Sequence, residues 1–330
     1  MTIQDSLTTK DCDSDDGAND SGAQIVSLSA LDAVKTNHNA SVTPEASGYG
    51  VNRNWLAELS LGFVAGPDKT LMKEFRFKGP LRVQRPFYPE GAPCHIYILH
   101  PPGGLVSGDN LKIDIDCQKN SHAVLTTPSA GKIYQADSCN VKQHQNVKLR
   151  LNEAICEWLP QETIVFNGAN GCLDTEIDLT ENAKFIGWDI YCLGRTAGNK
   201  PFDQGSVVQS LKVTKDGVPL LIERQIVNGG GTELTQRYGF SGHSVSGTLI
   251  VYGLGSPQSA VESLRESIDI ISSNSPFKGM LAVTQRLGVL LVRYLGPCSE
   301  EGKNLFIHCW KHLRKELLGL EASEPRIWLT

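Results

Sequence analysis

The sequence lacks the short motifs by which many proteins bind nucleotides or carry out catalysis. It has no GxxxxGK[ST] loop, so it shows no means of binding a nucleoside triphosphate by itself. It has no GxGxxG opening a helix after a strand, no GxSxG turn and no HExxH pair, and the three glycines at 229–231 are a loop tract. No motif assembles a catalytic constellation, so we expect a protein that is not an enzyme.

Long apolar runs and an excess of positive charge are also missing. No run reaches the roughly 18 to 20 apolar residues of a membrane-spanning helix. The first residues are acidic and polar, so we expect no secretory signal. The formal net charge of -5 provides no concentrated basic surface for nucleic acid or anionic lipid. We therefore expect a cytoplasmic protein whose partners are neither nucleic acid nor membrane.

The nine cysteines are scattered, and none belongs to a CxxC pair. A zinc site of that spacing is therefore not expected, and without a secretory signal neither is a disulfide framework. Free cysteines are among the most buried residue types, so we expect most of them to fill the core. The alternative, in which one or two of them lie where a metal ion passes, stays open.

The composition of residues 1–50 differs from that of the rest. The segment from Asp11 to Gly22 is rich in Asp, Ser, Asn and Gly, and no sustained hydrophobic period follows it. Such a segment buries too little apolar surface to offset the entropy of ordering, so we expect a disordered extension. One β domain is expected over residues 51–330, with its patterned sequence starting at Trp55.

A hydrophobic period of two runs from Trp55 to about residue 250 and predicts β-strands. Apolar residues alternate with charged ones over 111–117, and residues 147–151 and 176–179 repeat the pattern. Asp-Gly at 216–217 predicts a hairpin turn between two such runs. No helical pattern separates successive strands, which excludes a doubly wound βαβ sheet and favours an antiparallel or layered all-β body.

Helical periodicity is found only toward the C-terminal end. Apolar residues recur in steps of three and four over 261–271, after a Ser-Pro start signal at 256–257. Residues 305–318 form a second amphipathic stretch, and Gly319 is a plausible stop. We therefore predict two helices at this end of the chain.

His308 and His312 lie one helical turn apart on the second stretch, a spacing that can bind a metal ion. Lys311 and Arg314 flank them, however. We therefore interpret this face of the helix as basic and solvated rather than as a metal site.

The loop HPPGGLVSGD at 100–109 is the first of three polar clusters in an apolar or glycine-rich context. Its prolines and glycines fix a specific backbone, and Asp109 ends it just before an alternating strand. The simpler interpretation is a turn in which Asp109 accepts hydrogen bonds from nearby backbone amides.

Asp189 and Glu223 are the carboxylates of the other two clusters. Asp189 lies in an otherwise apolar run, where an unpaired carboxylate would be costly, and Arg195 is a candidate partner. Glu223 and Arg224 follow apolar residues in an expected strand, so one of the two must face the interior or a cavity if the strand is two-sided. Buried ion pairs would explain both clusters without any functional role.

These segments resemble the urease accessory proteins of the UreD (also called UreH) family. The resemblance is carried, in chain order, by GPLRVQRPFYPE at 79–90, HPPGGLVSGD at 100–109, TTP at 126–128 through Lys132 and Tyr134, EWLPQE at 157–162, GWD at 187–189 with LGR at 193–195, LLIER at 220–224 and PRIWLT at 325–330. It extends from about Trp55 to Thr330, which is nearly the whole patterned part of the chain.

The resemblance implies a mainly β, layered and β-helix-like body of antiparallel and mixed strands, with two helices toward the C-terminal end. It implies a non-enzymatic urease maturation factor that works with UreF and the GTPase UreG on apo-urease, as a dimer of heteromeric complexes through UreF. It also implies no tightly bound cofactor. Nickel would pass transiently through the interior, lined by Asp109, Asp189 and Glu223.

A nickel passage makes physical demands that these carboxylates can meet. The cost of desolvation prevents a bare ion from crossing an apolar core, so the passage must be wet. Isolated oxygen ligands bind nickel weakly enough to release it, whereas a His/Cys cage would retain it. Two other hypotheses remain open. One is a hydrolase that uses the three carboxylates as acid and base. The other is a β-rich adaptor with no metal role.

Overall fold

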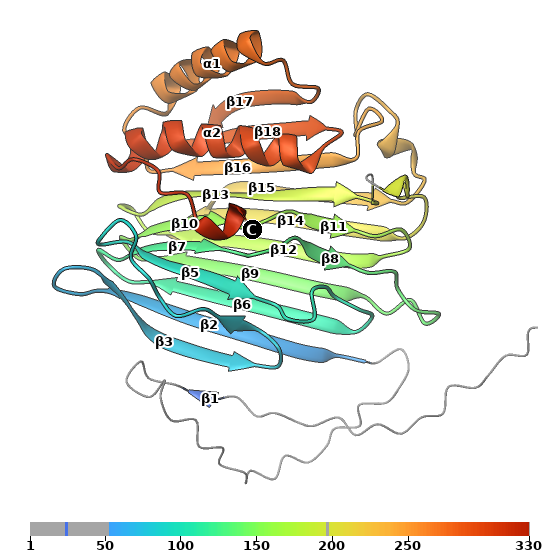
Figure 1. The fold of residues 1–330 in the computed structure, drawn as a ribbon, viewed down its shortest axis with the longest axis horizontal. Coiled ribbons are helices and arrows are strands. Elements are labelled where there is room, and N and C mark those ends of the chain that lie inside the picture. The colour runs from blue at the N-terminus through green and yellow to red at the C-terminus, as the bar shows by residue number, and fades with distance from the viewer. Residues whose placement is uncertain (1–23, 26–52, 196–197, 330) are drawn as a thin grey trace, which may run out of the picture.

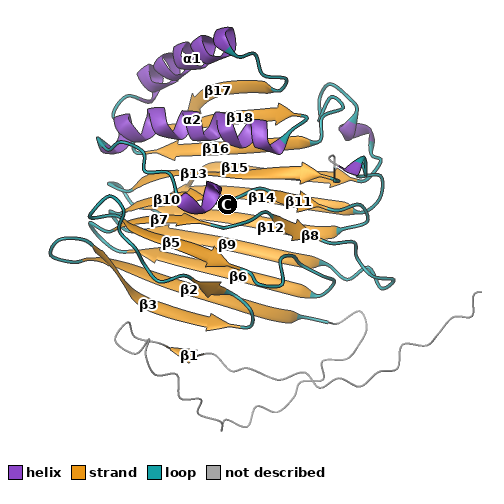
Figure 2. Ribbon diagram, viewed as in Figure 1, coloured by secondary structure: helices purple, strands orange, loops and turns teal. Residues whose placement is uncertain are grey.

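The computed structural model describes residues 24–25, 53–195 and 198–329, and strands dominate it. Two sheets face each other, and the two α-helices lie together at one end of the molecule (Figure 1). Both helices come from the last quarter of the chain, and Figure 2 shows them in purple beside the orange strands at that end of the molecule. The predicted mainly β architecture with two C-terminal helices is confirmed.

The first sheet, here sheet I, has the strand order β1-β3-β2-β6-β9-β12-β14-β15. The strands are β1 Gln24–Ile25, β2 Trp55–Ala65, β3 Thr70–Lys78, β6 Asp109–Cys117, β9 Gln143–Leu151, β12 Asn170–Leu179, β14 Ser206–Lys215 and β15 Val218–Asn228. Neighbours from β2 to β14 are parallel, while β3 and β15 pair antiparallel at the two ends.

The second sheet, here sheet II, has the order β17-β18-β16-β13-β10-β7-β5-β4, with β11 and β8 attached beside β13. The strands are β4 Arg82–Val83, β5 Cys94–Leu99, β7 His122–Thr126, β8 Gly131–Ile133, β10 Ile155–Leu159, β11 Thr163–Val165, β13 Lys184–Leu193, β16 Val245–Tyr252, β17 Met280–Arg286 and β18 Val289–Gly296. Its middle, from β5 to β13, is parallel, and β16, β18 and β17 continue it antiparallel.

The parallel strands arise because the chain passes from one sheet to the other and back. Strands β6, β9 and β12 of sheet I alternate along the chain with β7, β10 and β13 of sheet II. Each return adds one strand to each sheet, so that Asn110 pairs with His144 and Gln143 with Gly171. Parallel neighbours ordinarily need a helical crossover, but here the opposite sheet provides the return path. The result is the layered, β-helix-like body that the family resemblance implies.

Strand alternation builds the core between the sheets. The apolar residues at 111, 113, 115 and 117 are buried while the residues between them are half-buried, as the period of two predicts. The same holds in β9 and β12. The expectation for cysteine holds for most of the described ones, since Cys94, Cys117, Cys156, Cys192 and Cys309 are buried.

A second core lies between the outer face of sheet II and the helices α1 (Pro257–Asn274) and α2 (Ser299–Leu318). Trp188 and Leu249 of sheet II pack there with Phe306 and Trp310 of α2. Helix α2 begins at Ser299, six residues before the predicted start. It is capped by Gly319, whose φ of 68° is the left-handed conformation that glycine adopts most easily. Short 3-10 turns occupy Thr232–Leu234 and Arg326–Leu329.

The two helices are also joined by polar contacts through the histidine pair of α2. The ring Nε2 of His308 lies 2.8 Å from the Ser267 hydroxyl of α1, and that of His312 lies 2.9 Å from Ser263. The two histidines therefore link α2 to α1, and their side chains are not simply solvated.

The interpretation of Arg314 as part of a solvated face is wrong, because its side chain is completely buried. Its Nε donates to both carboxylate oxygens of Glu157 at 3.0 and 2.9 Å, and its Nη2 donates to Glu90 at 2.8 and 2.7 Å. Trp310 and His122 also bond to Glu157. Burial by itself would raise the pKa of Glu157, but the contacts with His122, Arg314 and Trp310 outweigh it, and the pKa is lowered.

The predicted hairpin between β14 and β15 is confirmed. Asp216 and Gly217 both have positive φ, 48° and 79°, which is the backbone of a type I′ turn and matches the twist of the flanking strands. Within the N-terminal extension, Gln24–Ile25 pair with Arg76 and Phe77 of β3. The rest of residues 1–50, on which the prediction of disorder falls, lies outside the described residues.

Candidate functional site

Sheet II is longer than sheet I at the helical end of the molecule. Strands β16, β18 and β17 continue beyond β15, the last strand of sheet I (Figure 1). A cavity of about 390 Å³, here cavity 1, lies at this step and is lined by side chains of β13 to β18. Asp189, Glu223 and Arg293 are its charged residues. The structure thus brings two of the three predicted carboxylates to one cavity.

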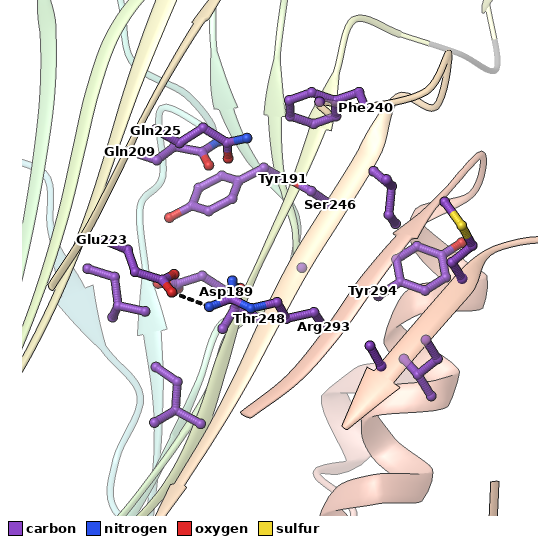
Figure 3. A pocket seen from close by; sticks show the side chains of 18 of the residues that line it. Asp189, Tyr191, Gln209, Glu223, Gln225, Phe240, Ser246, Thr248, Arg293 and Tyr294 are labelled. Carbon is purple, nitrogen blue, oxygen red and sulfur yellow. Dashed lines mark hydrogen bonds and ion pairs between the residues drawn. The ribbon is translucent and has the colours of Figure 1, made fainter. Parts of the chain in front are cut away.

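Asp189 points into cavity 1 from β13, as Figure 3 shows. Its Oδ2 accepts a hydrogen bond from the Thr175 hydroxyl at 2.8 Å, and its Oδ1 accepts one from the Trp158 indole N–H at 3.4 Å. Enclosure by the protein raises the pKa of Asp189 to about 6, although the contacts from Thr175, Trp158 and Tyr191 lower it. At neutral pH the carboxylate is therefore largely ionised, with neutral groups around it.

Arg195, the expected partner of Asp189, lies elsewhere. Its guanidinium stacks 5.2 Å from the ring centre of Phe166. Among the described residues no ion pair reaches Asp189. The ion-pair explanation of this cluster is therefore wrong. Arg195 is close to Asp189 along the chain, but its side chain points toward Phe166 instead.

Glu223 is the member of the Glu223–Arg224 pair that faces the interior, and Arg224 is exposed. Its carboxylate pairs with the guanidinium of Arg293 on β18, shown by the dashed line in Figure 3. Arg293 also donates to the Thr248 hydroxyl at 3.3 Å. The side chains of Arg293 and Glu223 keep 41% and 36% of their exposure, so the pair is wet. An ion pair does exist here, but it joins the two sheets rather than neighbours in sequence.

A second cavity of about 330 Å³, here cavity 2, is also lined by Asp189. The HPPGG loop contributes His100, Pro101 and Gly103 to its wall, and the segment 127–132 contributes another part. Among the residues that the structure describes, Asp189 alone lines both cavities. The side chain of Asp189 is half-buried, because its carboxylate opens on these two cavities.

One glycine of the HPPGG loop is required by the closeness of its neighbours. A Cβ added at Gly104 would lie 2.6 Å from the Tyr134 ring and 2.8 Å from the Cβ of Lys132. Only glycine allows the loop to pack this closely against β8 and the residue after it. The loop backbone thereby forms a fixed wall of cavity 2.

Asp109 lies at the start of β6, away from both cavities. Its Oδ2 accepts a hydrogen bond from the backbone N–H of Val106 at 2.8 Å. Burial raises the pKa of Asp109, and the Val106 N–H lowers it in part. These contacts are those of the turn that the sequence offers as the simpler interpretation. The structure does not bring Asp109 together with Asp189 and Glu223.

Sequence reasoning missed Arg293, Thr248 and Thr175. Arg293 had a usable signal, since it is the single charged residue in the apolar run VLLVRYLG at 289–296. The threonines had none, because their role depends on which strands become neighbours.

Within residues 53–195 and 198–329, no three His, Cys, Asp or Glu side chains are grouped closely enough to hold a metal ion. The site is thus two separate carboxylates that reach one cavity from opposite sheets, with an arginine paired to one of them.

Neither helix of the described part of the chain is both long and apolar enough to cross a membrane.

Comparison with known proteins then identifies the family. A family model described as UreD urease accessory protein matches residues 56–329. A urease accessory protein UreD of Chromohalobacter salexigens is 44% identical over 293 residues, which cover 86% of this chain and 91% of that protein. One of Pseudoalteromonas translucida is 43% identical and covered completely, across 92% of this chain. The chain therefore belongs to the UreD family of urease accessory proteins.

Proposed function

We propose that this chain, whose family implies a role in urease maturation, is a non-enzymatic scaffold through which nickel reaches apo-urease. In this proposal UreF and the GTPase UreG are its partners, with UreF joining two such complexes into a dimer. The ion travels between the two sheets. Cavity 2, Asp189 and cavity 1 with Glu223 are successive stages of the passage.

The observation that carries this proposal is the position of Asp189. Its carboxylate opens on both cavities and is surrounded by neutral hydrogen-bond donors rather than by a cation. A negative charge of this kind, held inside the protein, attracts a cation more strongly than the same charge in bulk water. Asp189 therefore supplies the oxygen contact that an ion needs at the junction of two cavities.

The size and composition of the cavities suit a hydrated ion. Volumes of about 390 and 330 Å³ accommodate several water molecules each, so nickel can keep part of its hydration shell. Oxygen ligands that are spaced along the path bind nickel weakly, and weak sites in series permit exit as well as arrival. The arrangement favours transit over storage. The place of Asp109 in the passage stays a prediction without a supporting contact.

The test replaces Asp189, Glu223 or both by Leu and measures two quantities. One is the recovery of the complex with UreF, UreG and apo-urease, and the other is the nickel content of the urease obtained. Asp114→Leu is the matched control, because Asp114 lies on the outer face of sheet I, paired with Arg150. We expect normal recovery with nickel-poor urease for the single replacements, and the lowest nickel content for the double replacement.

Other results decide between the alternatives. Normal recovery with a full nickel content in the double variant would defeat the passage and leave an adaptor with no metal role. Poor recovery would instead show that the carboxylates are structural. This second result is not expected from the contacts, since Glu223 and its partner Arg293 are partly exposed and such pairs contribute about 0–1 kcal/mol.

A further inference from the structure

We propose that Arg293 is a built-in counter-ion of the passage, which occupies the carboxylate of Glu223 until a divalent cation displaces it. This inference rests on the proposed nickel passage and adds to it a residue that decides when the last carboxylate is free. It is carried by the contacts of Arg293 in cavity 1 (Figure 3).

Arg293 reaches the passage from the third strand of a row. Asp189 of β13 is the register partner of Thr248 on β16, and Thr248 is the register partner of Arg293 on β18. Register partners share one face of a sheet and adjacent strands are about 4.8 Å apart, so the Cα atoms of Asp189 and Arg293 are about 10 Å apart. All three side chains line cavity 1.

The guanidinium of Arg293 crosses this cavity to Glu223 on the opposite sheet. One nitrogen, Nη2, pairs with the Glu223 carboxylate, and the other, Nη1, donates to Thr248 at 3.3 Å. A cation that leaves Asp189 toward Glu223 therefore meets a positive charge on a carboxylate that is already occupied. Arginine is always protonated in proteins, so it cannot vacate Glu223 by losing a proton and must move away.

The pair is built to be displaced rather than to hold the fold. Both side chains are more than a third exposed, and ion pairs in contact with water contribute little to stability. The Thr248 hydroxyl offers the guanidinium a hydrogen bond when Glu223 is taken. A divalent cation is attracted to the carboxylate with twice the Coulomb energy of a single charge at the same distance, whereas a monovalent cation has no such advantage over the guanidinium. Arg293 thus favours divalent cargo.

The test measures equilibrium binding of Ni²⁺ to the full-length chain by calorimetry, with an affinity tag that contains no histidine. Arg293→Gln removes the charge and keeps a polar side chain. Removing one positive charge about 5 Å from a divalent ion should tighten binding about tenfold in water-like surroundings. Arg293→Lys keeps the charge and should bind Ni²⁺ as the unaltered chain does. Arg286→Gln on the exposed part of β17 is the matched control for net charge.

The double variant E223Q/R293Q shows whether the gain acts through Glu223. We expect it to lose the tighter binding, and a gain that survives in it would overturn the inference. Unchanged or weaker binding by Arg293→Gln would also overturn it, with Arg293→Met as the second variant if the first does not fold. If Arg293→Gln leaves Ni²⁺ binding unchanged but Glu223→Gln weakens it, the role of Arg293 is refuted while the proposed nickel passage still stands. Only if Glu223→Gln and Asp189→Asn also bind Ni²⁺ like the unaltered chain does the proposed function fail as well.

Discussion

Replacing Arg314 by Met should destabilise the fold severely, although the residue lies on a helix whose sequence pattern is amphipathic. The side chain is fully buried and donates four hydrogen bonds to the carboxylates of Glu157 and Glu90. Methionine keeps the approximate length of the apolar stem and removes the guanidinium. Glu157 then stays completely buried without a permanent cation beside it.

The magnitude follows from this burial. Removing one partner of a buried ion pair costs about 3–5 kcal/mol, because the other charge is left uncompensated. That is a large part of the roughly 5–15 kcal/mol by which domains are stable. Urea unfolding of the full-length chain measures the change. Lys311→Met on the same helix is the control, since Lys311 is half-exposed and pairs with Glu324 at the surface, where the loss should stay below about 1 kcal/mol.

The dependence on pH gives the prediction a sign. In the unaltered chain the pKa of Glu157 is lowered, so its contribution is present above the ordinary value of 4.5 and is lost as the pH falls through the lower folded value. Without Arg314, one of the contacts that offset burial is lost, although His122 and Trp310 remain beside Glu157, so the folded pKa rises. The Arg314→Met variant should therefore lose most stability at neutral pH and recover part of it near pH 4. A loss below 1 kcal/mol at pH 7, or a deficit that grows on acidification, would refute this reasoning.

Two further predictions concern Asp189 and the N-terminal extension. The pKa of Asp189 is raised to about 6, so the folded state holds an extra proton between about pH 4 and 6 and loses stability as the pH rises through that range. Asp189→Asn should therefore make the free energy of unfolding less dependent on pH and increase it by about 1–3 kcal/mol at pH 7. An unchanged dependence on pH would contradict the raised pKa. A truncation that starts at Asn52 removes only the two-residue pairing of β1 from the described fold. The free energy of unfolding, measured in urea, should therefore change by less than about 1 kcal/mol. Failure of the truncated chain to fold would contradict the prediction.

The period of two and the turn chemistry made the fold largely predictable. Alternation over 111–117 assigns each side chain to a face, and Asp216-Gly217 marks a hairpin, because both signals are local. The order of the strands is not local. The same alternation suits an antiparallel neighbour or a parallel one that returns through the opposite sheet, so the sequence left both open.

The candidate site shows the same limit. Asp189 and Glu223 stood out as carboxylates in apolar runs, and both do face cavity 1. Their partners could not be inferred, because Glu223 meets Arg293 70 residues away and Arg314 meets Glu157 at a separation of 157 residues. Arg195 and Arg224 were the expected partners only because they are near in sequence. Contacts between sheets are decided by packing, which no pattern along the chain records.

The return of the chain through both sheets has a consequence for how the molecule opens. Each turn of this coil touches mainly the turn before it and the turn after it, as in solenoid proteins, where stability is a sum of nearest-neighbour terms. At one end of the stack α1 and α2 cover the outer face of sheet II, whereas at the other end the outer edge of β3 pairs, within the described part of the chain, with the two residues of β1. Amide hydrogen exchange should therefore spread inward from β3 and reach β13, which carries Asp189, among the last strands.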